Sequence, residues 1–202
     1  MKLTNKPIKR LSLYIFLIFL AFQTPSQADD IRDFQIEGMS IGDSLLDYFD
    51  VSEIKKSEEN SFVFKKKKFM IIFSPLESDI FDDVQITYKI DDKKYIIHGL
   101  EGKINFINNY SDCIKKKKEI EKELKIIFKD SEFKNYKKKH GYDRSGKSTT
   151  TSTDFIIKSG GFSDIYCTDW SEEMEYENEY TDDLTISLGS EEFRIFMMTA
   201  YK

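Results

Sequence analysis

The sequence is poor in the residues that punctuate or cross-link a chain, with 9 glycines, 3 prolines and 2 cysteines among 202 residues. Scarce glycine and proline exclude a collagen-like or low-complexity chain. Aromatic residues make up 14%, which is too rich in core-forming side chains for a chain that is disordered throughout. The length fits one domain of ordinary size or two very small ones.

Motifs of metal and catalytic sites are equally scarce. The two histidines, His98 and His140, stand far apart, and the chain contains no H-x-x-x-H or C-x-x-C pattern that would indicate a zinc site of local spacing. The G-x-S-x-G turn of many serine hydrolases is also absent. Carboxylates are abundant, but abundance identifies no acid–base pair. The sequence therefore indicates no catalytic residue, no metal ligand and no cofactor.

One phosphate-binding motif is present as a literal match. Residues 141–148 read GYDRSGKS and fit the P-loop pattern G-x-x-x-x-G-K-S/T through Gly141, Gly146, Lys147 and Ser148. A P-loop follows an apolar strand and opens a helix, whereas lysines precede this match and a serine–threonine run with poor helix propensity follows it. We therefore interpret the match as a false positive, in a lysine-bearing loop.

The N-terminus resembles an export signal. Residues 1–10 carry four basic side chains and no acid, the almost entirely apolar run 11–22 follows, and Ser26 and Ala28 provide small residues at −3 and −1. The apolar run has 12 residues, short of the about 20 that span a membrane. We expect cleavage after Ala28, a periplasmic or secreted location, and no transmembrane span in the remaining soluble chain.

Export sets expectations for the charge and the cysteines. Loss of the four basic residues changes the net charge from −5 to −9. Cys113 and Cys167 would stand in an oxidising compartment, where an even pair favours a disulfide over two buried free thiols. The bridge would close a loop of about 55 residues, which is equivalent to roughly 4 kcal/mol of stability.

Periodicity in the first half predicts a helix followed by a meander of strands. Ser40 and Asp43 have the spacing of a capping box, and apolar residues repeat at helical spacing over 36–49. Strand patterns then follow at 69–73, 84–90 and 95–107.

The second half repeats this order with a helix and further strands. A helix is expected over 111–129, and the polar stretch 130–151 is predicted to be a long loop. Later elements are a hairpin of strands 153–158 and 162–170 about Ser159–Gly161, a strand at 184–188, and a segment at 190–200 that fits a helix, with a strand as the alternative. The order α-βββ-α-ββ-β-α predicts an α+β fold with antiparallel sheet and helices packed on one face. We expect a single domain over 29–202, with sub-halves 29–109 and 110–202 as a duplication left open.

Charge is unevenly distributed along the chain. Residues 114–140 hold 11 lysines and 5 acids, whereas residues 164–192 hold 11 acids and no basic residue. The basic stretch would suit an envelope polyanion such as an anionic lipid or polysaccharide, and a protein partner is the other possibility left open. The net acidity and export argue against nucleic acid. The acidic stretch 172–183 lacks the ligand ladder of a calcium loop. The simplest interpretation is two solvated faces that screen each other.

Two resemblances can be stated. The start IEGMSIGDSLLDYF together with CTDWSEEM at 167–174 resembles small exported bacterial proteins of unknown function. Gly38-Met39-Ser40 before a meander resembles the helix start of the BamE/SmpA outer-membrane assembly lipoproteins over residues 36–107, although the lipobox cysteine of that family is absent. Neither resemblance implies functional residues. The sequence favours a non-catalytic binding or scaffolding protein of the cell envelope, with a hydrolase of dispersed catalytic residues as the alternative.

Overall fold

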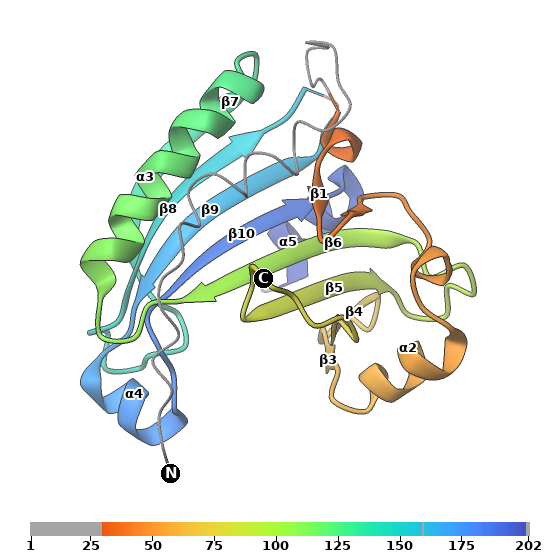
Figure 1. The fold of residues 1–202 in the computed structure, drawn as a ribbon, viewed down its shortest axis with the longest axis horizontal. Helices are drawn as coiled ribbons and strands as arrows, with labels where there is room; N and C mark the ends of the chain where they lie inside the picture. Colours follow the sequence, from red (N-terminus) through yellow and green to blue (C-terminus); the bar gives the residue numbers. More distant parts are fainter. Residues whose placement is uncertain (1–29, 159, 201–202) are drawn as a thin grey trace.

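The computed structural model describes residues 30–158 and 160–200. Their centre is an eight-stranded antiparallel sheet with strand order β3-β4-β5-β6-β10-β9-β8-β7 (Figure 1). Its strands are β3 (Phe62–Val63), β4 (Phe69–Phe73), β5 (Asp83–Lys89), β6 (Ile97–Asn105), β7 (Glu132–Lys139), β8 (Thr149–Ile156), β9 (Phe162–Asp169) and β10 (Asp183–Gly189). A small sheet pairs β1 (Gln35–Ile36) with β2 (Met39–Ser40). The fold is therefore α+β with antiparallel sheets, as predicted.

Along the chain, the helices lie between groups of strands. The described helices are the 3₁₀ turns η1 (Ile31–Asp33) and η2 (Leu45–Asp47) and the α-helices α2 (Val51–Glu58), α3 (Tyr110–Ile127), α4 (Glu172–Asn178) and α5 (Glu191–Ala200). α2 precedes β3 to β6, and α3 precedes β7 to β10. The two groups of four strands meet at the β6–β10 pair, and in each group the strands follow chain order from the outer edge of the sheet inward to this pair. The sub-halves therefore contribute matching blocks to one continuous sheet.

One face of the sheet carries the main core and α3, and we call it the α3 face. Ile86, Leu100 and Ile165 are buried there, and the N-terminal segment of residues 31–54 packs against the same cluster. Cys113 of α3 and Cys167 of β9 form a disulfide with Cα atoms 6.1 Å apart. This bridge was predicted, and it fixes α3 to β9, the third strand from the β7 edge of the sheet.

The opposite face, which we call the α5 face, is covered over only part of its area. α5 packs Phe193 and Phe196 against Phe64 and Phe69 in a second, smaller core. Figure 1 shows α3 in front of the sheet and α5 behind it. The prediction that the helices pack on one face is therefore wrong for α5. The segment 190–200, open between helix and strand, is a helix.

The predicted helix over 36–49 is also wrong. Glu37 and Gly38 both have positive φ values, 52° and 78°, and form the tight turn of the β1–β2 hairpin. The Asp43 carboxylate accepts a hydrogen bond from the Ser40 backbone N–H at 2.9 Å, so this pair closes a turn and caps no helix. The first α-helix described begins later, where Asp50 and Glu53 form a capping box.

The predicted loop over 130–151 contains β7 and the start of β8. β7 is an edge strand whose residues are almost all exposed, so both of its faces are polar and it lacks the alternation that reveals a half-buried strand. Lysines on an exposed edge also discourage pairing with another chain. The paired strands expected on either side of residues 159–161 and the strand at 184–188 are present as β8–β9 and β10, and Ser159 lies outside the described residues.

The signal-peptide prediction lies outside the described residues. Within residues 30–158 and 160–200 we find no helix with the length and hydropathy that spanning a bilayer requires.

Candidate functional site

A hollow of about 750 Å³ lies on the α5 face, beside the helix, and we call it the groove. Side chains of β6, β10, β9 and β8 form its floor. β7 and the β7–β8 loop close one end, and α5 with Phe64 closes the other. Because the floor groups stand on paired strands, their mutual positions are fixed by the sheet.

Polar side chains form a row across the groove floor. The strand register places Asp154 opposite Asp164, Asp164 opposite Ser187, and Ser187 opposite Glu101. Ser187 Oγ donates a hydrogen bond to Glu101 Oε2 at 2.9 Å, and Ser152 Oγ donates one to Asp154. Within the described residues the Asp164 carboxyl accepts no hydrogen bond, and none of the three carboxyls forms an ion pair.

Burial changes the protonation of this row. Burial raises the pKa of Glu101, against the hydrogen bond from Ser187. Burial, followed by the charges of Asp154 and Glu101, raises the pKa of Asp164 to about 8, and Lys138 opposes this shift. At neutral pH the Asp164 carboxyl therefore keeps its proton. A cation placed in the groove would favour the ionised row.

The end of the groove beneath α5 is apolar. Gly189 lies opposite Gly99 on one side and opposite Phe162 on the other. A Cβ atom at Gly189 would lie 2.0 Å from the Phe162 ring, so glycine allows the ring to cover the backbone. The Phe193 ring of α5 packs on Phe69 with ring centroids 5.2 Å apart. Ile156 and Met197 complete this apolar end.

The other end of the groove is aromatic and polar. Tyr136, Tyr142 and Lys138 line it, and the Tyr142 side chain is 72% exposed. Thr150 stands on the floor between them and is 5% exposed, and its Oγ1 has no hydrogen-bond partner among the described residues. Buried hydroxyls are normally hydrogen-bonded, so this atom is an unused polar contact at the groove.

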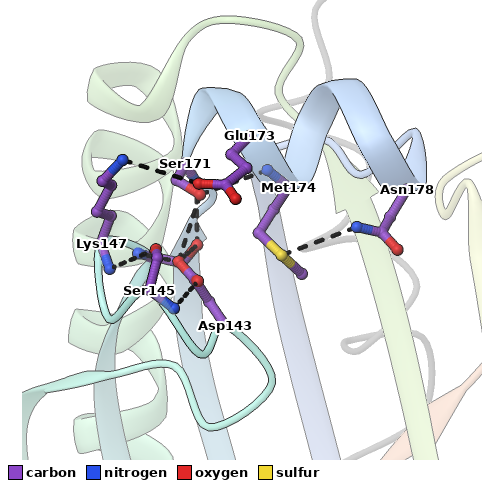
Figure 2. Close-up of polar contacts among 8 residues, drawn as sticks. Asp143, Ser145, Lys147, Ser171, Glu173, Met174 and Asn178 are labelled. Atoms are coloured by element: carbon purple, nitrogen blue, oxygen red, sulfur yellow. Dashed lines mark hydrogen bonds and ion pairs between the residues drawn. The ribbon is translucent and has the colours of Figure 1, made fainter.

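Asp143 organises the β7–β8 loop beside this end. Its carboxylate accepts hydrogen bonds from the Ser145 N–H at 2.8 Å and from the Ser148 N–H and Oγ, each at 2.7 Å. Hydrogen bonds from Ser145 and Ser148 hold the pKa of Asp143 well below its usual range. Ser171, the N-cap of α4, donates its hydroxyl to Asp143 at 3.3 Å (Figure 2). The loop and α4 are therefore joined through one carboxylate.

The P-loop match is contained in this loop. Gly141, Gly146, Lys147 and Ser148 lie between two antiparallel strands, and β8, not a helix, begins at Thr149. The Ser148 hydroxyl is bonded to Asp143. Lys147 Nζ lies 3.8 Å from a carboxylate oxygen of Glu173 (Figure 2). The segment therefore lacks the strand–loop–helix arrangement that presents amides to a phosphate.

The histidines were the remaining candidates for chemistry. His98 Nδ1 lies 3.0 Å from Ser190 Oγ and 4.0 Å from Glu192 Oε2, beside a hollow of about 370 Å³. A serine–histidine–acid triad places the hydroxyl and the carboxylate on different ring nitrogens, whereas here both face Nδ1. Ser190 Oγ also accepts the Phe193 N–H at 3.2 Å and caps α5. Burial lowers the pKa of His98, so its ring is neutral at pH 7.

His140 lines the groove but lies far from the carboxyl row. The His140 backbone N–H donates a hydrogen bond to the Ser148 carbonyl, so His140 lies beside Ser148. Asp164 lies beside Asp154, further along β8. The six residues from 148 to 154 separate these levels by about 20 Å along the strands. The two groups therefore cannot act on one substrate atom. His140 packs on Trp170 with ring centroids 4.3 Å apart.

Among the residues that the structure describes, no ion pair joins the basic stretch 114–140 to the acidic stretch 164–192. The ion pairs of α3 are internal, such as Lys117–Glu121 and Lys125–Glu121. Residues 172–178 of the acidic stretch form α4, and within the described part of the chain no group of three potential ligands is placed to hold a metal ion.

No family model, curated protein or solved structure matches the chain. The resemblances stated above remain predictions.

Proposed function

We propose that this protein is a non-catalytic binding protein of the cell envelope, periplasmic or secreted, and that the groove is its binding site. The observation that carries this proposal is the groove itself, which crosses the floor of four paired strands and leaves polar atoms of Asp164 and Thr150 without hydrogen-bond partners in the described residues. Concave sites with an apolar part and few convergent polar groups are typical of binding. The disulfide is compatible with an oxidising compartment.

A hydrolase remains the alternative, but the geometry favours binding. An acid–base mechanism needs two titratable groups within reach of one substrate atom. Asp154 and Asp164 meet this condition, but the Ser187 and Ser152 hydroxyls bonded to the row have no histidine beside them, since His140 is about 20 Å from the row along the strands. Ser190 is engaged as a helix cap. Among the partners expected from sequence, a protein is favoured over an envelope polyanion for this site, since the groove floor carries carboxyls.

Site-specific photocrosslinking in intact cells tests this function. A photoreactive residue replaces Tyr142, exposed at the groove rim, and in a control replaces Ile126, 75% exposed on α3 at the opposite face. We expect a discrete adduct from position 142 and none from position 126. Equal labelling from both positions, or labelling from 126 alone, would remove the groove as the binding site. N-terminal sequencing of the same material tests export, with Asp29 expected as the first residue.

A further inference from the structure

Two lysines, Lys138 and Lys103, act on Asp164 and Glu101 only at a distance and form no ion pair with the carboxyl row within the described residues. Asp154, Asp164 and Glu101 share one row of the sheet and form no ion pair within the described residues. Full ionisation of this row would place like charges directly opposite each other on neighbouring strands, which destabilises a sheet, and buried charges are normally paired. A row of this kind is complementary to a cation that arrives from outside.

Thr150 is an independent indication that the groove binds a ligand. Thr150 precedes Asp154 on β8 and points to the same face of the sheet. It is 5% exposed, and its Oγ1 has no hydrogen-bond partner among the described residues. An unmade hydrogen bond of a buried hydroxyl costs free energy that a ligand can recover. A polar group of an occupant is therefore expected at this level as well.

The strands hold the apolar end of the groove and the carboxyl row at a fixed distance from each other. Ile156 pairs with Phe162, and Asp154 pairs with Asp164 two residues along the same strands. Two residues of a strand span about 7 Å. Side chains that share one face of an extended ligand repeat at the same distance. An extended peptide that lies along the strands would thus place one side chain at the apolar end and the side chain two residues away over the carboxyl row.

We propose that the groove binds an extended segment of a partner protein that carries a lysine or arginine two residues from an aromatic or aliphatic residue. The basic side chain lies over the carboxyl row, and the apolar side chain lies against Phe162 and Met197 beneath α5. This identification of the ligand rests on the proposed function of the groove.

The length of the groove favours a peptide segment over a small cation. Its lining runs along β8 from Thr150 to Ile156, which is about 20 Å of strand. Six or seven residues of an extended chain match this length, and a single amine would fill only the acidic level. Electrostatic complementarity of this kind gives an interface its register and its specificity.

A random heptapeptide display library, selected on the purified disulfide-bonded protein, provides the test. We expect the enriched peptides to carry lysine or arginine two positions from an aromatic or aliphatic residue. The triple variant Asp154→Asn, Asp164→Asn, Glu101→Gln should weaken the best peptide at least about tenfold. A matched triple variant outside the groove, Glu119→Gln, Glu123→Gln, Glu177→Gln, makes the same number of carboxyl-to-amide changes and should alter binding less than about twofold.

Two kinds of failure are distinguishable. Enriched peptides without a basic residue that still lose affinity with Ile156→Trp, a variant that fills the apolar end, would overturn the cationic ligand and leave the groove as a binding site. If the enriched peptides bind the Ile156→Trp variant as tightly as the native protein, or if no peptide is enriched, both the proposed ligand and the proposed function are wrong. The amide variants retain the shapes of the native side chains and remove repulsion, so the fold is expected to persist.

Discussion

Asp154 and Asp164 lie directly opposite each other on β8 and β9, and neither forms an ion pair within the described residues. Ionisation of both carboxyls would place like charges opposite each other, which destabilises a sheet. The pair is retained here on the floor of the groove, where α5 leaves the strands uncovered. Groups that bind ligands commonly reduce the stability of the protein that holds them. The pair therefore links the binding proposal to a measurable cost in stability.

Asp164→Asn should stabilise the protein, and the gain should grow with pH. The pKa of Asp164 is raised to about 8, so between about pH 4 and pH 8 the folded state binds a proton that the unfolded state releases. Stability of the native protein therefore falls as pH rises through this window. Asparagine is neutral throughout, so the variant should match the native melting temperature near pH 4 and exceed it by several degrees at pH 8.

Thermal unfolding monitored by circular dichroism from pH 4 to pH 9 measures this difference. Glu123→Gln, a carboxyl change on α3 at the opposite face, is the control and should show no such trend. A constant difference between Asp164→Asn and the native protein across this range would show that Asp164 is already ionised, and the account of the carboxyl row would be wrong.

The sheet could be predicted mainly where its strands are half-buried. Residues 84–90 alternate apolar and polar side chains, and β5 is found there. β7 was missed because an exposed edge strand has no buried face to impose alternation. The helix expected over 36–49 failed for a different reason, since its capping pair also satisfies a tight turn, and the turn after Glu37-Gly38 prevailed.

The groove could not be predicted because it depends on strand register and on the position of α5. Asp154 and Asp164 are visible in the sequence as polar residues of a hairpin, and that hairpin was predicted. Glu101 joins their row only because β10 inserts between β9 and β6, a long-range pairing that local patterns do not encode. The disulfide could be predicted from the sequence because two cysteines allow only one pairing.

Ser190→Ala tests whether Ser190 is a cap or a nucleophile. Loss of the bond from the Phe193 N–H should cost about 1 kcal/mol, as expected for an N-cap, and lower the melting temperature by about 2–4 °C. Ser190→Asp retains a capping oxygen and should remain close to the native stability. Hydrolysis of a model ester by the native protein that both variants abolish would support the hydrolase alternative.

Opening the Cys113–Cys167 bridge should destabilise the protein by about 4 kcal/mol, because the unfolded chain regains the freedom of a long loop. Urea unfolding with and without a reductant measures the change. The double variant Cys113→Ser, Cys167→Ser should match the reduced protein and be insensitive to reductant. Equal midpoints for the oxidised and reduced native protein would show that packing of α3 on β9 suffices without the bridge.

Asp143→Asn should loosen the β7–β8 loop and its junction with α4. Asparagine is a weaker acceptor than carboxylate for the N–H groups of Ser145 and Ser148, so their amides should exchange faster with deuterium. Because these bonds hold the pKa of Asp143 below its usual range, the native loop should stay protected as pH falls through the ordinary carboxyl range and lose protection only at lower pH.

Lys147→Ala, which removes only an exposed ion pair, is the control and should leave exchange unchanged. Protection of these amides gained on addition of magnesium and a nucleoside triphosphate would instead restore the phosphate-binding interpretation of GYDRSGKS.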